Sequence, residues 1–133
     1  MVLAIAIAMV VAVGLFLVAL GLAALFRPPA ARRFLLGFAG SAAKHYAELG
    51  IRLAVGAALL IASPSMVGSE VVAGAGLVLL VTTGFMLFLP WRWHRAFALK
   101  AVPSALAYLP IIGLSSVALG VAVLWSLLAT SAV

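Results

Sequence analysis

The chain has 133 residues, of which 68% are hydrophobic and 8% charged, and its mean hydropathy is +1.43. Soluble domains carry about 45–50% apolar and about 25% charged residues, so this composition excludes a water-soluble fold. Cys, Asp, Asn and Gln are absent and the only carboxylates are Glu48 and Glu70, which excludes thiolate metal sites and leaves few groups for acid–base catalysis.

Four apolar stretches are each predicted to cross a membrane as a helix, which needs about 20 such residues. They cover residues 1–26, 46–62, 71–90 and 110–128. A signal peptide is the competing interpretation of residues 1–26, but no basic residue precedes this stretch and Arg27-Pro28-Pro29 ends it. The short turn at 63–70 makes the second and third spans antiparallel neighbours. The sequence therefore predicts a single all-α domain, an integral membrane bundle of four helices.

The basic residues predict how the chain is oriented. All eight lie in two stretches, 27–52 and 92–100. Basic loops stay cytoplasmic, so both termini are predicted to face the periplasm or exterior of a bacterial inner membrane. The pieces at 30–44 and 93–106 are too short to span and are expected in the headgroup layer, where they suit anionic lipid better than nucleic acid. The residues assigned to this interface are Arg32, Arg33, Lys44, Trp91, Arg92, Trp93, Arg95 and Lys100.

The two halves of the chain resemble each other. Each contains an apolar span, a basic break with proline, a short amphipathic piece and a second apolar span. Tyr46 corresponds to Tyr108, Gly50 to Gly113 and Gly56 to Gly120, at offsets of 62 to 64 residues. We therefore predict two tandem helical hairpins related as a parallel repeat about an axis along the membrane normal. The alternative is that any two apolar hairpins with basic turns look alike.

Small residues recur at every fourth position and predict where helices touch, because close backbone approach stabilises helix pairs in lipid. The clearest series lies in the second span, and Gly120 belongs to the fourth span. The predicted packing residues are Gly50, Ala54, Ala58, Ala62 and Gly120. The pattern leaves open whether these faces meet within one chain or between chains.

The ionisable residues at the start of the second span are the main candidates for a specific contact. Glu48 and Arg52 are four residues apart and share a helix face, so they are predicted to form an ion pair or to contact a partner. His45 and Tyr46 lie beside them. Two histidines without Cys or Asp do not make a credible catalytic metal site. Hydrogen bonding at the interface is their expected role, and axial ligation of a pigment or haem is the less favoured alternative. No catalytic constellation and no cofactor are predicted.

The second half also resembles a known group of proteins. Residues 77–125 contain a proline followed by Trp91-Arg92-Trp93, and then a helix with the pattern G-L-x-x-x-x-L-G-x-x-x-L from Gly113 to Leu124. This segment is similar to small uncharacterised bacterial inner-membrane proteins, which implies a helical membrane protein and no active site. Small multidrug exporters have a similar length, but they need an acidic residue in the first span, and this chain has none there.

Two functions are compatible with these features. The first is a structural or accessory subunit, not an enzyme, that packs against a larger membrane complex or against copies of itself. The alternative is an oligomeric channel or transporter for a small or lipophilic solute, with a polar path from Thr82, Thr83, Ser115, Ser116 and the Glu48–Arg52 pair. A lipid-binding role would rest on the basic aromatic interface alone. The expected partners are the bilayer and other membrane protein chains, and nucleic acid is not expected.

Overall fold

The computed structural model describes residues 1–37 and 40–131, so residues 38–39 of the predicted interfacial segment 30–44 lie outside the described part. The α-helices in this part are α1 (Val2–Phe26), α2 (Pro28–Gly37), α3 (Ala42–Ala62), α4 (Ser69–Phe88), α5 (Trp91–Leu106) and α6 (Leu109–Ser131). Within these described residues, four helices are long and apolar enough to cross a membrane: Val2–Phe26, Ala42–Ser65, Ser69–Phe88 and Leu109–Thr130. The predicted all-α, four-helix membrane fold is confirmed.

Local sequence explains the ends of the spanning helices. Helix α1 ends at Phe26, before Pro28-Pro29. Helix α3 begins earlier than the predicted residue 46, because the Ser41 hydroxyl accepts a hydrogen bond of 3.2 Å from the Lys44 amide and caps the helix at Ala42. Between α3 and α4 the 3-10 turn η2 (Ser63–Ser65) is followed by Gly68, whose φ of 73° suits a residue without a Cβ.

Two prolines have different effects near the start of α6. Pro103 lies inside α5 and does not end it, although a proline there removes one intrahelical hydrogen bond. Pro110 lies in the first turn of α6, where the missing N–H would have no helical partner. The short helix α5 therefore continues to Leu106, and α6 starts at Leu109.

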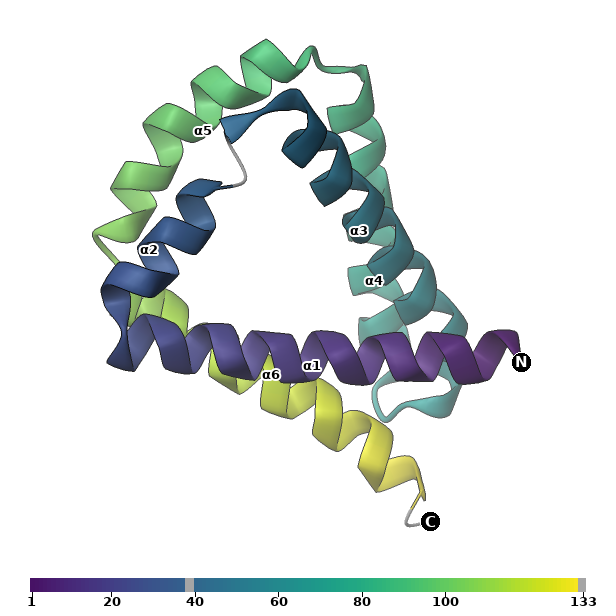
Figure 1. Cartoon of the computed structure of the whole chain (residues 1–133). Coiled ribbons are helices and arrows are strands. Elements are labelled where there is room, and N and C mark those ends of the chain that lie inside the picture. The colour runs from purple at the N-terminus through teal and green to yellow at the C-terminus, as the bar shows by residue number, and fades with distance from the viewer. Residues whose placement is uncertain (38–39, 132–133) are drawn as a thin grey trace.

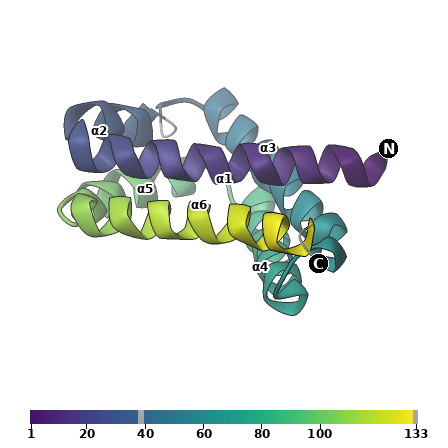
Figure 2. The same cartoon turned by 90° about the horizontal axis from the view of Figure 1, so that it is seen from below.

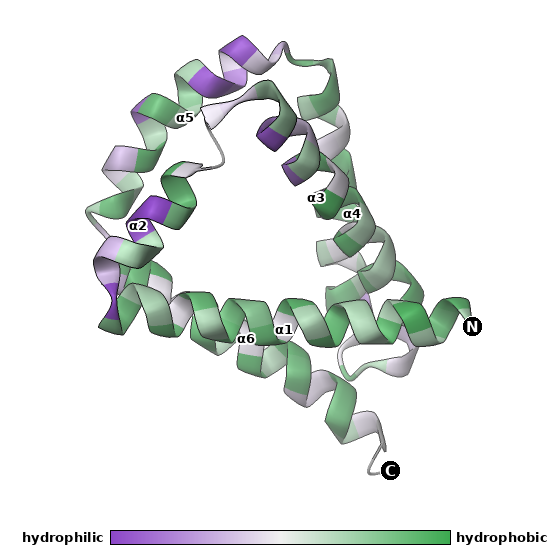
Figure 3. Cartoon of the chain, viewed as in Figure 1, coloured by the Kyte–Doolittle hydropathy of each residue, from purple (hydrophilic) through white to green (hydrophobic). Residues whose placement is uncertain are grey.

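The helices form the three sides of a triangle (Figure 1). Helices α1 and α6 share one side, α3 and α4 share the second, and α2 and α5 lie along the third. Seen from below, the first three helices lie in one layer and the last three in the other (Figure 2). The hydrophilic residues gather on α2, α5 and the start of α3 (Figure 3), and we call this region the basic side.

The corner opposite the basic side is closed by apolar packing, and we call it the far corner. Its buried cluster joins α1, α3, the turn after α3, and α6, and consists of Ala6, Val10, Ala58, Ala62, Met66 and Leu127. Hydrogen bonds reinforce it, because the Val67 amide donates to the Ser126 carbonyl (3.0 Å) and the Ser126 hydroxyl donates to the Val67 carbonyl (2.6 Å). The spans therefore converge at the far corner and separate toward the basic side.

Glycines allow the close contacts within each pair of spans. A Cβ built on Gly120 would lie 2.7 Å from the carbonyl oxygen of Gly14, and one on Gly76 would lie 2.8 Å from that of Gly56. Carbon and oxygen atoms cannot approach so closely without displacement, so both pairs need glycine at the crossing. The main helix contacts thus join the two halves of the chain, α1 with α6 and α3 with α4.

The small residues predicted to form one packing face on the second span lie in three different environments. Ala58 and Ala62 are buried against α1 at the far corner, whereas Ala54 faces the interior of the triangle. Gly50 is open, because a Cβ added there would meet no atom within 4 Å. Gly120 of the fourth span contacts Gly14 of the same chain. Most of these residues therefore serve packing within one chain.

We predict that Gly120→Ala lowers the thermal stability of the purified protein, because the added methyl group overlaps the backbone of α1. Overpacking of this kind costs about 1–3 kcal/mol. Gly84→Ala is the matched control, because a Cβ at this helical position meets no atom within 4 Å. The control should unfold at the same temperature as the native protein or slightly higher. Equal loss of stability in both variants would contradict the close α1–α6 contact.

Candidate functional site

A cavity of about 760 Å³ lies inside the triangle, a volume typical of sites for small molecules. Its walls come from α1, α2, α3 and α5, and of the 17 lining residues only Glu48, Arg52 and His94 carry polar or charged side chains. The cavity exists because the two pairs of spans separate toward the basic side while α2 and α5 connect their ends. It is therefore a partly open, mainly apolar space with few polar groups, which we call the chamber.

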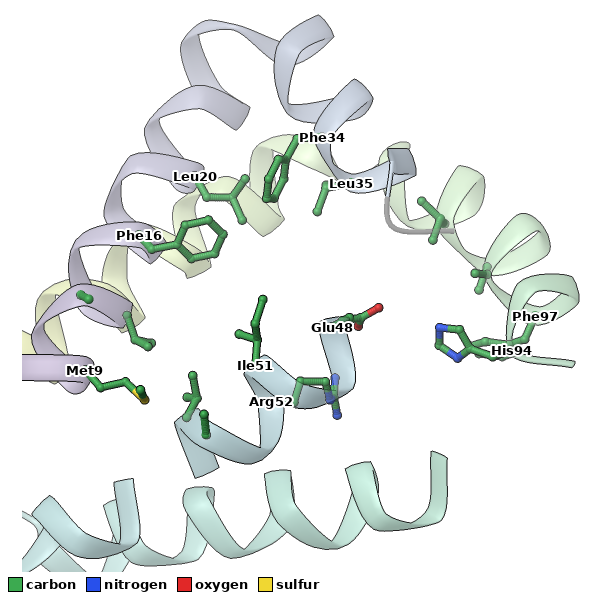
Figure 4. Close-up of a pocket in the computed structure, with 17 residues that line it drawn as sticks. Met9, Phe16, Leu20, Phe34, Leu35, Glu48, Ile51, Arg52, His94 and Phe97 are labelled. Carbon is green, nitrogen blue, oxygen red and sulfur yellow. The ribbon is translucent and has the colours of Figure 1, made fainter. Parts of the chain in front are cut away.

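The polar side chains gather at one side of the chamber (Figure 4). Glu48 and Arg52 extend from the early turns of α3, and His94 extends from α5. At the other side, Met9 and Phe16 of α1 form part of the apolar wall. The chamber therefore has a polar end near the basic side and an apolar body that reaches toward the far corner.

The Arg52 guanidinium is held across the helix pair by α4. Its Nε donates to Oγ1 of Thr83 (3.0 Å) and its Nη2 donates to Oγ1 of Thr82 (3.2 Å). Thr83 is fully buried, and its own hydroxyl donates to the Leu79 carbonyl at 2.6 Å. Burial of a hydroxyl is costly unless it is hydrogen-bonded, so Thr83 and Arg52 satisfy each other.

The predicted ion pair between Glu48 and Arg52 is replaced by this contact with α4. Within residues 1–37 and 40–131, the Arg52 hydrogen bonds run to the two threonines and none runs to Glu48. The threonines outcompete the carboxylate because α4 lies directly against α3, whereas Glu48 faces the chamber. The two charged residues therefore line the same cavity without binding each other.

His45 and His94 meet between the two halves of the chain. Their ring centroids are 4.5 Å apart, and the ring of Tyr46 lies edge-on to His45 at 5.1 Å. His45 is only 2% exposed, and neither of its ring nitrogens has a hydrogen-bond partner among the described residues. This differs from the interfacial hydrogen bonding expected from the sequence. Tyr46 itself is largely exposed.

The residues assigned to the membrane interface lie on the basic side. The Arg95 guanidinium lies over the Trp91 ring at 5.6 Å, a cation–π contact within α5. Arg32 of α2 donates from Nη2 to the Leu106 carbonyl at 3.3 Å, so it joins the two short helices. The remaining residues of this group are exposed: Arg33, Lys44, Arg92, Trp93 and Lys100.

The polar path for a solute that was predicted from the sequence is not formed within one chain. Ser116 donates to the Leu17 carbonyl of α1, Ser115 is exposed, and neither lines the chamber. Sequence reasoning also missed the aromatic walls from α2 and α5, Phe34 and Phe97. No local signal identifies these residues, because their role depends on how the short helices fold back across the basic side.

The described part of the chain has few side chains that could bind a metal ion. No group of three or more His, Cys, Asp or Glu side chains in this part is arranged to hold a metal ion.

Comparisons of the chain with protein-family models, curated proteins and solved structures found no significant match. The resemblance of residues 77–125 therefore remains a prediction, and function has to be argued from the chamber itself.

We predict that Arg52 and Thr83 are energetically coupled in a double-mutant cycle with Arg52→Met and Thr83→Val. Each single change removes the same hydrogen bond, so the double variant should lose about 0.5–1.5 kcal/mol less than the sum of the single changes. Thermal or denaturant unfolding in a mild detergent measures these differences. A matched cycle of Arg52→Met with Thr130→Val should be additive, because Thr130 bonds within α6. Additivity in both cycles would show that the contact contributes nothing.

Proposed function

We propose that the protein binds a small lipophilic solute in its chamber and carries it within or across the membrane, without catalysing a reaction. The observation that supports this most is the chamber of about 760 Å³ with three polar groups at one end. Ligand sites are usually concave and mainly apolar, with a few polar groups that fix orientation. This proposal keeps the lipophilic solute of the channel or transporter alternative, but it places the solute in a chamber within one chain and not in an oligomer.

The absence of a catalytic role is part of the same proposal. Acid–base and nucleophilic catalysis need a base within hydrogen-bonding reach of the group that it activates. Within the described residues, the hydroxyls of Thr82, Thr83, Ser116 and Ser126 donate to backbone carbonyls. This arrangement gives no support to nucleophilic catalysis by these hydroxyls.

We also propose a bacterial inner-membrane location with both termini outside the cytoplasm. The support is the concentration of basic side chains on α2, α5 and the start of α3 (Figure 3), since basic segments are retained on the cytoplasmic side. The basic side would then face the cytoplasm, and the far corner would face the periplasm. The short helices α2 and α5 would lie at the cytoplasmic headgroups.

A parallel repeat of the two halves is supported by their helix contacts. If the first half of the chain is matched to the second, α1 corresponds to α4 and α3 corresponds to α6. The α1–α6 pair then corresponds to the α4–α3 pair, and these two pairs have the most extensive helix contacts. The same correspondence relates the Gly14–Gly120 crossing to the Gly76–Gly56 crossing, at offsets of 62 and 64 residues. We propose that the halves are related by a two-fold axis along the membrane normal.

A second candidate function is that of a subunit in a larger membrane assembly or homo-oligomer. Glycines on α3 and α4 support it, because Gly50, Gly74 and Gly84 have nothing within 4 Å of a Cβ position. Exposed small residues permit close approach by another helix. Native mass spectrometry from lipid nanodiscs tests this role, and a uniformly monomeric protein without co-purifying chains would contradict it.

The proposed solute site is tested by filling the chamber. We expect the purified protein to bind the neutral lipophilic dye Nile red, and Ala54→Phe to weaken binding about tenfold or more, because the new ring occupies the chamber. Fluorescence titration in a mild detergent measures the Kd. Ala122→Phe is the matched control, since Ala122 is exposed on α6 and does not line the chamber.

Transport is tested separately in proteoliposomes. Efflux of the dye from protein-containing vesicles should exceed efflux from protein-free vesicles, and Ala54→Phe should abolish the excess while Ala122→Phe retains it. Binding that is equal in the native protein and in Ala54→Phe would refute the site. Binding without any excess flux would restrict the function to solute storage or sensing.

A further inference from the structure

The polar end of the chamber offers both kinds of hydrogen-bonding group. Ionised Glu48 is an acceptor only, whereas arginine has five N–H donors and no acceptor. The contacts with Thr83 and Thr82 occupy Nε and one N–H of Nη2, so further Arg52 donors remain available. His94 also lines this end of the chamber. A ligand head that both donates and accepts can therefore be bound at this end.

The polar end contains one acidic and one strongly basic side chain. Among the 17 lining residues, Glu48 contributes the one carboxylate and Arg52 the one guanidinium. An ammonium head would be attracted by Glu48 and repelled by Arg52, and a sulfonate head would meet the reverse. Repulsion is stronger in an apolar chamber than in water, because the local dielectric constant is low. This combination therefore favours a head without net charge.

The position of the polar end matches the way an amphiphile lies in a bilayer. Glu48 and Arg52 are six and ten residues from the start of α3 at Ala42, which places them about 9–15 Å from the basic end of that helix. The apolar wall continues from there to Met9 on α1. A molecule bound with its head at Arg52 would extend its apolar body toward the far corner, as membrane amphiphiles do.

We infer that the chamber takes a neutral amphiphile, an apolar chain or ring system with a hydroxyl head bound between the Glu48 carboxylate and the free N–H groups of Arg52. The hydroxyl hydrogen is donated to Glu48, and the hydroxyl oxygen accepts from Arg52. Phe16 and Phe34, whose rings are 5.9 Å apart, line the apolar body of the site. This inference rests on the proposed function, because it names the class of solute that the chamber binds.

The test compares three probes with the same ten-carbon chain and different heads. These are decanol, decyltrimethylammonium and decyl sulfonate, each used to displace Nile red from the protein. Decanol should displace the dye with a Kd about tenfold or more below that of both charged probes, because each charged head meets one repulsive group. The same titrations with Ala54→Phe measure how much dye signal is lost because the probes partition into detergent. This loss is subtracted from the signal of the native protein.

Charge variants make the test specific to the two residues. Glu48→Gln leaves Arg52 uncompensated and should raise the affinity for decyl sulfonate about tenfold, whereas Arg52→Gln should do the same for decyltrimethylammonium. Glu70→Gln removes the other carboxylate, which is exposed and outside the chamber, and should keep the native order. Because two opposite variants are used, unfolding of one does not remove the test.

The outcomes separate this inference from the proposed function. Preference for decanol in the native protein, with opposite shifts in the two charge variants, supports the inference. Displacement by all three probes with equal Kd, or strongest displacement by a charged probe, overturns the inference and leaves solute binding in place. Failure of Nile red and of all probes to bind the native protein overturns both.

Discussion

Close backbone contact at glycine crossings is the constraint on which the rest of the structure depends. Lipid gives no hydrophobic drive for helices to associate, so the spans need surfaces that permit tight van der Waals packing. Gly14 with Gly120 and Gly56 with Gly76 provide these surfaces, and both crossings join the first half of the chain to the second. The four spans therefore form two pairs instead of one uniform bundle.

The chamber follows from how these two pairs are connected. Ala6, Ala58 and Leu127 hold them together at the far corner, while α2 and α5 keep their other ends apart. Helices that diverge in this way leave volume between them, and apolar spans line that volume with apolar side chains. Among the described residues, the carboxylate and the guanidinium that line it both come from α3, near the basic side. One arrangement thus accounts for the cavity, its apolar body and its polar end.

Local properties of the chain could be predicted from sequence, and relations between distant segments could not. Hydropathy and length identify the spans, and the basic clusters mark the short helices α2 and α5 between them, because these features depend only on neighbouring residues. A series such as Ala54, Ala58 and Ala62 indicates a packing face but does not specify its partner. Likewise Glu48 is the obvious partner for Arg52 on one helix, yet Thr83 binds it from another. The chamber was unpredictable because it depends on the angle between helix pairs.

The most direct test of this account is cysteine cross-linking in membranes, which the absence of native cysteine makes specific. Leu17→Cys with Ser116→Cys should form a disulfide on mild oxidation, because the Ser116 hydroxyl lies 2.8 Å from the Leu17 carbonyl oxygen across the α1–α6 pair. Leu20→Cys with Ile51→Cys should not, because the chamber separates Leu20 of α1 from Ile51 of α3 (Figure 4). Rapid cross-linking of the second pair and none of the first would contradict the account, since it would mean that α1 packs along α3 and no chamber exists.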